Sequence, residues 1–536
     1  MLKFLFAVAA ILLVSCSSDL TIIHVNDTHS HLFGSKVFCE YNSKAYQFNL
    51  GGYGAVMQVV SGIRKEKNDT LFLHAGDLIQ GTRYFREFQG KADVDLMNDA
   101  GLDALALGNH EFDKGSRFLA NLLEKAKFPV LAVNVEIDKD LELAKFVKPY
   151  IIKGSWPHKT AVIGVITPDT STISSPGSGV LFKDPAETLR KTIKSLKKDS
   201  IDQIIVLSHV GYENDIKLAQ DVAGIDVIVG GHSHTLLGYT GLKCLPSFAD
   251  YPQIVKDPAG RDVLVVQAWD HARAVGKLDL KFDIHGEIIA YSGKIFFPIR
   301  KDVKLPFPDK RSPFNEFLRL DENKFVDAKM SVYRQAASEK YEKVVAIVTE
   351  DLDHAWEKGS DLAPMVADAI IWKLREKNIE VDVAMQNAGG VRNSLHKGKL
   401  TLGEIYDVLP FFNYLAILKI KGKELEKAFK RSINQASKGI HQGAFPYLSG
   451  MKFDIVDKDA VNFRIVKDGH ESPVEPEKEY LFATDSYIAQ GGNGYYEFHN
   501  VSKIEMTQFV VSDVFAEYCM KKKTLSKPEF RHPSLN

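Results

Sequence analysis

The chain has 536 residues, of which 45% are hydrophobic and 26% are charged, as in an ordinary globular protein. Single hydrophobic cores stop growing near about 250–300 residues, so this length favours at least two domains. The formal net charge of −1 gives no general attraction to nucleic acid or to an anionic membrane. We therefore expect no nucleic-acid polymer as a partner, and any phosphate recognition must come from a local site.

The first residues have the pattern of an export signal. Lys3 precedes an unbroken apolar run over residues 4–14, too short to span a bilayer, which needs about 20 residues. The run ends at Leu13-Val14-Ser15-Cys16, which resembles the bacterial lipobox, whose cysteine is acylated. We expect a signal peptide with lipobox over residues 1–18 and a lipid anchor on Cys16. The protein would then be an exported lipoprotein facing the periplasm or the cell surface, although an ordinary signal peptide cut nearby is the alternative.

Three cysteines remain if Cys16 is acylated, namely Cys39, Cys244 and Cys519. Three thiols cannot all pair, and a chain of this size does not need disulfides to hold a core. We expect buried or free thiols with one possible bridge, which the sequence does not assign.

Short apolar and β-branched runs alternate with helix-compatible stretches in the first half of the chain. These runs suit strands that are buried on both faces, and they predict an α/β layered domain. They cover residues 20–25, 70–73, 104–107, 161–166, 204–207, 227–229 and 263–266.

The composition shifts after Phe297, where proline and charge crowd residues 298–313. A charged, helix-compatible stretch follows, and a new apolar run begins at Val344. We predict a catalytic domain over residues 19–314, a linker helix over 315–343 and a second, α+β domain over 344–536.

Five of the predicted strands end in blocks rich in aspartate, histidine and asparagine. In an open α/β sheet the carboxyl ends of the strands line one edge, where ligands bind. Imidazole, carboxylate and amide donors together suit Zn²⁺, Mn²⁺ or Fe²⁺. A single histidine after a strand is more often a hydrogen-bonded residue than a ligand, but five such blocks predict a metal site. The blocks are Asn26-Asp27-Thr28-His29, Gly76-Asp77, Gly108-Asn109-His110-Glu111-Phe112-Asp113, Ser208-His209 and Gly231-His232-Ser233-His234.

The order of these blocks resembles that of the calcineurin-like metallophosphoesterases. Within them, the chain is similar to the 5′-nucleotidase family over nearly its whole length after the signal. The resemblance implies a four-layer α/β/β/α domain, a linking helix and a C-terminal nucleotide-binding domain. It also implies that nucleoside 5′-monophosphates are hydrolysed to nucleoside and phosphate by attack of a metal-bound hydroxide. Two divalent metal ions are the expected cofactors, with zinc favoured and manganese or cobalt as alternatives.

The resemblance carries the metal ligands over residue by residue. Asp27, His29 and His234 are expected on one metal, although some relatives have glutamine at the last position. Asn109, His209 and His232 are expected on the other metal, and Asp77 is expected to bridge the two. His110 with Asp113 resembles the catalytic dyad of the family, and the alternative for Asp113 is a carboxylate in the first turn of a helix.

The resemblance also implies substrate-binding residues in the second domain. They are Asn387, Gly390 and Arg392 in one loop, the rings of Phe411 and Tyr487 as a nucleobase sandwich, and Asn493. The guanidinium of Arg392 is a planar fork for phosphate oxygens. The two rings could instead belong to the core, and Asn493 stands where close relatives carry aspartate for ribose hydroxyls. The substrate is expected to bridge the two domains, with rotation about the linking helix gating its binding.

One segment departs from the family. Many relatives carry an arginine followed by Glu-Ser-Asn-x-Gly-Asn, where this chain has Trp356-Glu357-Lys358-Gly359-Ser360-Asp361. One phosphate contact is therefore in doubt. Cleavage of UDP-sugars or NAD, or of 2′,3′-cyclic nucleotides, remains an alternative. From other classes, the chain could be an inactive surface-binding lipoprotein or a solute receptor that feeds a transporter.

Overall fold

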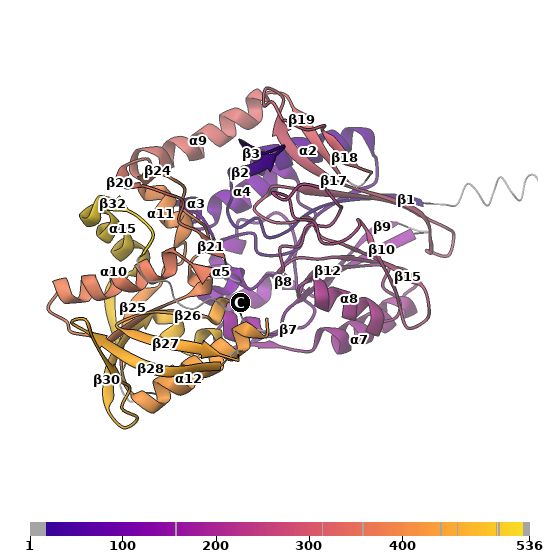
Figure 1. The fold of residues 1–536 in the computed structure, drawn as a ribbon. Helices are drawn as coiled ribbons and strands as arrows, with labels where there is room; N and C mark the ends of the chain where they lie inside the picture. Colours follow the sequence, from indigo (N-terminus) through magenta and orange to yellow (C-terminus); the bar gives the residue numbers. More distant parts are fainter. Residues whose placement is uncertain are drawn as a thin grey trace, which may run out of the picture. The chain divides into compact units, whose positions relative to one another are not determined.

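The computed structural model describes residues 18–155, 158–313, 315–355, 359–439, 442–457, 459–499, 501 and 504–528. Residues 1–17 of the expected signal peptide, which include Cys16, and the segment containing Trp356 and Lys358 lie outside these residues. The chain forms two compact units: unit 1 extends to Gln80 and resumes over residues 88–333, and unit 2 contains residues 81–87 and the chain from Arg334 onwards (Figure 1). None of the helices described is long and apolar enough to cross a membrane.

Unit 1 is built on two sheets. The first has the strand order β18 (Lys310–Ser312), β19 (Asn315–Leu320), β17 (Ile288–Arg300), β16 (Val275–Phe282), β1 (Ser18–Val25), β4 (Thr70–His74), β5 (Ala104–Ala106), β6 (Val130–Leu131) and β8 (Val147–Lys148). The second has the order β14 (Gln253–Lys256), β15 (Asp262–Val266), β13 (Val227–Val229), β12 (Gln203–His209), β10 (His158–Ile166) and β9 (Tyr150–Ser155).

The two sheets pack face to face with helices on their outer sides. Strand β10 contacts β5 and β6 across the interface between the sheets. Helix α2 (Tyr53–Glu66) packs on β17 and on α4 (Lys91–Ala100), while α7 (Pro185–Lys198) and α8 (Tyr212–Asp221) pack on the second sheet. This arrangement confirms the layered α/β fold expected from the sequence.

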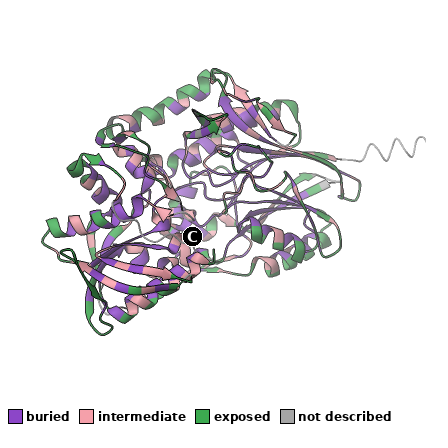
Figure 2. Cartoon of the chain, in the orientation of Figure 1, coloured by how far each residue is buried: buried purple, intermediate pink, exposed green. Residues whose placement is uncertain are grey.

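Helix α7 shows why these segments fold as they do. Its buried residues Leu189, Ile193 and Leu196 recur every three or four positions and so form one apolar stripe. The Asp184 carboxylate caps its first turn by accepting a hydrogen bond from the Glu187 N–H at 2.7 Å. By contrast, all seven residues of β12 are buried, as expected of a strand covered on both faces, and Figure 2 shows the same burial of the central strands.

Each sheet contains a run of adjacent parallel strands, although β1 is antiparallel to β16 on its other side. In the first sheet β1 pairs with β4 and β4 with β5, and in the second β12 pairs with β13 and β13 with β15. The carboxyl ends of each set therefore share one edge, and this edge positions the candidate site.

The prediction of a helix from residue 315 onwards was wrong for its first residues. Residues Asn315–Leu320 form β19, which pairs in parallel with β17, and helix α9 spans Lys324–Tyr341. The segment Asn-Glu-Phe-Leu-Arg-Leu alternates in burial, with Asn315 and Phe317 buried in the core. Burial that alternates with a period of two residues indicates a strand. The helix was predicted because the segment is rich in charge, which does not distinguish the two. The domain boundaries near residues 314 and 344 stay predictions.

Unit 2 has a five-stranded sheet and its own apolar core. The strand order is β26 (Pro446–Ser449), β23 (Val383–Asn387), β30 (Glu479–Asp485), β25 (Tyr414–Lys421) and β31 (Ile504–Val510). Helices α10 (Leu362–Glu376), α11 (Leu402–Val408), α12 (Gly422–Ser437) and α15 (Val511–Lys522) accompany it.

Residues 81–87, although early in the chain, belong to unit 2. The Arg83 guanidinium donates to Asp407, with an Nε–Oδ2 distance of 3.1 Å. The Arg86 guanidinium donates to Asp513 at 2.6 Å and lies over the Tyr406 ring at 4.0 Å. These two arginines therefore fasten an early segment to helices of the C-terminal half.

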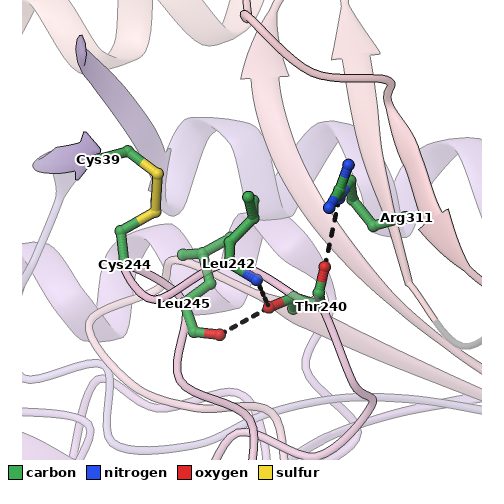
Figure 3. The surroundings of a disulfide bond; sticks show 6 residues. All are labelled: Cys39, Thr240, Leu242, Cys244, Leu245 and Arg311. Atoms are coloured by element: carbon green, nitrogen blue, oxygen red, sulfur yellow. Dashed lines mark hydrogen bonds between the residues drawn. A yellow bond between two sulfur atoms is a disulfide. The ribbon is translucent and has the colours of Figure 1, made fainter. Parts of the chain in front are cut away.

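A disulfide joins Cys39 in β2 (Phe33–Tyr41) to Cys244 (Figure 3). This is the one bridge that the sequence left unassigned, and Cys519 is a free, buried thiol. Thr240 holds the loop around Cys244, because its hydroxyl donates to the Leu245 carbonyl at 2.7 Å and its own carbonyl accepts from Arg311 (Figure 3). The bridge thus ties the β2–β3 hairpin, where β3 spans Lys44–Gly52, to the loop that follows His234.

Removing this bridge is expected to destabilise unit 1. The bridge closes a loop with a sequence separation of 205 residues, and loss of a native disulfide typically costs about 2–5 kcal/mol. Dithiothreitol should therefore lower the Tm of the wild type and of Cys519→Ala, but should not shift the Cys39→Ala/Cys244→Ala variant. A wild-type Tm that does not respond to reductant would contradict this expectation.

Candidate active site

The seven predicted metal ligands come together at the shared edge of the parallel strands. Six lie in loops within five residues of a strand end, and His209 is the last residue of β12. Five are buried, whereas His232 and His234 are partly exposed. The seven are Asp27 and His29 after β1, Asp77 after β4, Asn109 after β5, His209 in β12, and His232 and His234 after β13.

Asp27, His29 and His234 form the first group. The Nε2 atoms of His29 and His234 are 3.2 Å apart, and His234 Nε2 is 3.5 Å from Asp27 Oδ1. One donor atom from each residue lies within 4.8 Å of the other two. This spacing suits three ligands of one cation.

Asp77, Asn109, His209 and His232 form the second group. Asp77 Oδ2 is 3.1 Å from His209 Nε2, and Asn109 Oδ1 is 2.9 Å from His232 Nδ1. The same Asp77 oxygen is 3.8 Å from Nε2 of His29 in the first group. One carboxylate oxygen therefore lies next to histidines of both groups, which is the position that a bridging ligand requires.

The backbone at five of the predicted ligands is strained. Asp27, His29, Asp77, His232 and His234 all have positive φ, between 47° and 74°. Non-glycine residues rarely adopt this region, which costs about 1–3 kcal/mol each and concentrates at functional sites. Close approach adds to the constraint, because a Cβ on Gly108 would lie 2.3 Å from Asp77 Oδ1. The loops are thus held in a geometry that the chain would not adopt by itself.

The charges and donors of the cluster fit divalent cations. Burial raises the pKa of the Asp27 carboxyl to about 6 and lowers the pKa of the His232 imidazole to about 3. Burial also opposes charge on His209, but the adjacent Asp77 carboxylate outweighs it and raises the His209 pKa to about 10. The buried carboxylates therefore favour a positively charged group beside them. The mixture of imidazole nitrogens with carboxylate and amide oxygens suits zinc, manganese or iron.

Glu111 holds the loops that carry Asp77 and Asn109 together. Its buried carboxylate accepts hydrogen bonds from the N–H groups of Asp77 at 3.0 Å, Leu78 at 2.9 Å and Gly108 at 2.7 Å. Burial still raises the pKa of this carboxyl to about 7. The side chain therefore fixes the backbone that carries Asp77.

His110 lies beside the cluster with Asp113. His110 Nδ1 is 2.7 Å from Asp113 Oδ2, and Asp113 Oδ1 accepts from the Ser174 hydroxyl at 2.8 Å. The backbone N–H of His110 donates to Asp77 Oδ1 at 2.9 Å, and the His110 ring centroid is 5.2 Å from that of His29. The Asp113 carboxylate therefore contacts the imidazole, as the dyad prediction requires.

In unit 2, the predicted substrate loop follows β23. Asn387 is buried and its Nδ2 donates to the Gly443 carbonyl at 3.2 Å. A Cβ on Gly390 would lie 2.1 Å from Gln386 Nε2, so a larger residue there would have to displace that amide. The Arg392 guanidinium lies 5.9 Å from the centroid of the Phe411 ring.

Tyr487 and Asn493 form a second part of this region. The Tyr487 hydroxyl donates to Asn493 Oδ1 at 3.0 Å, and Asn493 Nδ2 donates to the Gly443 carbonyl that also binds Asn387. The segments that carry the two rings are adjacent, because Asn413 Nδ2 donates to Asp485 at 3.3 Å. The sandwich of Phe411 and Tyr487 stays a prediction.

Comparisons with known proteins agree with this arrangement. Residues 20–236 match the family described as calcineurin-like phosphoesterase, and residues 340–500 match the 5′-nucleotidase C-terminal domain. A probable 5′-nucleotidase of Treponema pallidum (strain Nichols) is 32% identical, over 89% of this chain and 87% of its own length. This chain belongs to the 5′-nucleotidase family. Like other members, it is a phosphoester hydrolase with the metallophosphoesterase fold, which implies divalent metals.

Two further family members are similar over most of their length. The NAD 5′-nucleotidase of Haemophilus influenzae is 32% identical over 90% of this chain and 86% of its own length. The crystal structure of a 5′-nucleotidase precursor from Thermus thermophilus superposes with a TM-score of 0.84 at 33% identity, covering 96% of this chain and 98% of that one.

The sequence did not reveal which residues form hydrogen bonds with the predicted histidine ligands and hold them in place. His29 Nδ1 bonds the Gln80 carbonyl at 3.0 Å, and His234 Nδ1 bonds Asp270 Oδ2 at 2.9 Å. Asp270 follows β15, which the sequence predicted as a strand over residues 263–266. Like the five polar blocks, Asp270 comes shortly after the end of a predicted strand, and this position is the signal that indicates it.

Metal removal is expected to destabilise unit 1 reversibly. A cation that binds only the folded state adds RT ln(1 + [L]/Kd), or about 2.7 kcal/mol at 100 times Kd. Dialysis against a chelator should lower the Tm, and adding Zn²⁺ should restore it. Asp77→Asn should abolish most of this response, and a Tm that is the same with and without metal would contradict the assignment.

Asp113→Asn is expected to lower kcat by about 10²-fold or more, since acid assistance by a positioned histidine contributes about 10²–10⁴-fold. The amide cannot favour the charged imidazole as a carboxylate does. Steady-state kinetics with metal content measured in parallel would test this. Unchanged kcat, or a loss of activity explained by lost metal, would count against the dyad.

Proposed function

We propose that the protein is an exported, dinuclear-metal 5′-nucleotidase that hydrolyses nucleoside 5′-monophosphates to nucleoside and phosphate. The observation that carries this proposal is the position of Asp77 Oδ2, 3.1 Å from His209 Nε2 and 3.8 Å from His29 Nε2. In this position the Asp77 carboxylate can belong to both groups of metal donors.

Asp27, His29 and His234 would hold one metal, and Asn109, His209 and His232 the other, with Asp77 shared. Zinc is the ion that we favour, because most of the donors in the two groups are imidazoles. When bound, a pair of such cations activates water at neutral pH and neutralises charge on the phosphate.

His110 would donate a hydrogen bond to the phosphate, and it would donate a proton to the oxygen atom that leaves with the nucleoside. The carboxylate of Asp113 on Nδ1 orients the ring and favours its charged form. Ser174 in turn holds Asp113 from the opposite oxygen. Nε2 is then the nitrogen that we assign to the substrate.

Unit 2 would recognise the nucleotide. The Arg392 fork suits phosphate oxygens, and the rings of Phe411 and Tyr487 suit a nucleobase, since stacking on aromatic rings contributes about 1–3 kcal/mol per base. Asn387 and Asn493 both donate to the Gly443 carbonyl, and this proximity supports a role for the two amides in binding ribose or phosphate.

Export and lipid anchoring through Cys16 complete the proposal. The lipobox-like sequence supports them, and so does the Cys39–Cys244 disulfide, because such bridges persist in oxidising compartments. The similar Thermus thermophilus protein is described as a precursor.

A second candidate is cleavage of a nucleoside diphosphate derivative such as NAD. The Haemophilus influenzae relative named NAD 5′-nucleotidase favours it. The same metals and the same base recognition would serve both substrates.

A screen of hydrolysis after chelation and metal add-back tests these proposals. We expect AMP to be turned over faster than NAD, UDP-glucose or 2′,3′-cyclic AMP, and chelation to abolish the reaction. Faster cleavage of NAD would favour the second candidate. No hydrolysis of any substrate with zinc, manganese or cobalt would favour a binding protein and overturn the proposal.

Arg392→Ala is expected to lower kcat/KM for AMP by about 10- to 150-fold, because hydrogen bonds to charged groups contribute about 1.5–3 kcal/mol. Arg464→Ala is the matched control, since Arg464 forms an ion pair with Asp454 in unit 2 outside the predicted loops. Equal effects of the two variants would remove Arg392 from the substrate site.

A further inference from the structure

The loop after β15 is built against the first metal-ligand group. Trp269, His271 and Ala272 all have positive φ, between 52° and 61°. The loop is fastened to the Asn26-Asp27 block, because Asn26 Oδ1 accepts from the Ala268 N–H at 2.8 Å and the Asp27 carbonyl accepts from the His271 N–H at 2.7 Å. A strained backbone held by such contacts points to a function for its side chains.

Asp270, in the middle of this loop, uses both carboxylate oxygens. Oδ2 is 2.9 Å from His234 Nδ1, and Oδ1 accepts from the guanidinium of Arg273, with Nε at 3.0 Å. That guanidinium is itself stacked 3.5 Å from the centroid of the Trp269 ring. Asp270 is buried, so the carboxylate is held from both ends.

This contact determines which nitrogen of His234 can bind a metal. An ionised carboxylate only accepts hydrogen bonds, so Nδ1 must carry the proton and Nε2 must carry the lone pair. His234 Nε2 faces His29 Nε2 at 3.2 Å and Asp27 Oδ1 at 3.5 Å. The lone pair is thus on the nitrogen that meets the other two ligands.

We propose that Asp270, clamped by Arg273, is a positioning residue that fixes the tautomer and orientation of His234 and thereby sets the affinity of the metal bound by Asp27, His29 and His234. The inference rests on the proposed two-metal function and adds a residue to it. Carboxylate partners of metal-binding histidines typically change metal affinity or activity by about 10–100-fold when they are mutated.

His234 depends on such a partner more than His29 and His209 do. Those two histidines bond the backbone carbonyls of Gln80 and Ala75, and their side chains are only 4% and 0% exposed. The side chain of His234 is 26% exposed, so packing restricts its rotation less. A charged side-chain acceptor compensates for this weaker packing.

A third metal bound by His234, Asp270 and His271 is the competing explanation, since their donor atoms lie within 4.8 Å of one another. Arg273 already occupies Asp270 Oδ1, and a neutral imidazole cannot offer both nitrogens as ligands. His271 is also stacked on His31 with ring centroids 3.9 Å apart, and its Nδ1 is 3.9 Å from Asp270 Oδ2. The orienting role fits these contacts better.

Cobalt titration of Asp270→Asn tests the proposal without relying on turnover. The amide can present N–H instead of oxygen to His234, which favours the tautomer that cannot bind through Nε2. We expect the wild type to bind two equivalents of Co²⁺, followed by visible absorption and by metal analysis after dialysis. In Asp270→Asn, one equivalent should bind about 10–100-fold more weakly and the other should be unchanged.

Asp257→Asn is the matched control. Asp257 is also buried in unit 1 and paired with an arginine, Arg261, but it accepts backbone N–H groups of a turn after β14. This variant should lose thermal stability while both cobalt affinities stay at the wild-type value. If Asp270→Asn binds both ions as the wild type does, or loses both equally, the proposal is overturned.

A double-mutant cycle keeps the test valid if Asp270→Asn folds poorly. His234→Gln removes the imidazole that Asp270 orients, so adding Asp270→Asn to it should not weaken the affected cobalt site further. Additive weakening would contradict the orienting role. A wild type that binds fewer than two equivalents would instead overturn the proposed two-metal function, and the positioning role with it.

Discussion

The site depends on one carboxylate, Asp77, held between two groups of histidines. Parallel strands β1, β4 and β5 in one sheet and β12 and β13 in the other bring donors that are far apart in sequence to the same edge. The carboxylates are buried, and burial alone would penalise their charge. Cations at this position would remove that penalty, which explains why so many polar groups can lie in a protein interior.

The strained backbone and the hydrogen bonds around Asp77 both fix the position of its carboxylate. Its positive φ is kept by Glu111, which accepts from the Asp77 N–H, and by the absence of a side chain at Gly108. His110 is tied to the same carboxylate through its backbone N–H. Asp77, His110 and Glu111 are therefore linked by hydrogen bonds, and we expect a substitution of any one of them to change the positions of the other two.

Much of this could be predicted from the sequence, because buried strands and the polar residues at their ends leave local signals. The α/β layering followed from the apolar runs and the five polar blocks followed from the strand ends, whereas the choice of seven donors within those blocks came from the resemblance to the family. Long-range pairings leave no such signal: nothing near Cys39 indicates Cys244, and although the end of β15 could have indicated Asp270, nothing indicates that Asp270 pairs with His234. Strand β19 was missed for another reason, since its alternation over six residues is short and its charges suggested a helix.

The central claim is that two cations share Asp77. Anomalous diffraction from zinc-loaded crystals, recorded on both sides of the zinc absorption edge, tests it most directly. The account predicts two peaks about 3.5–4 Å apart, one on each side of the Asp77 carboxylate. A single peak, or two peaks of which only one contacts Asp77, would contradict it.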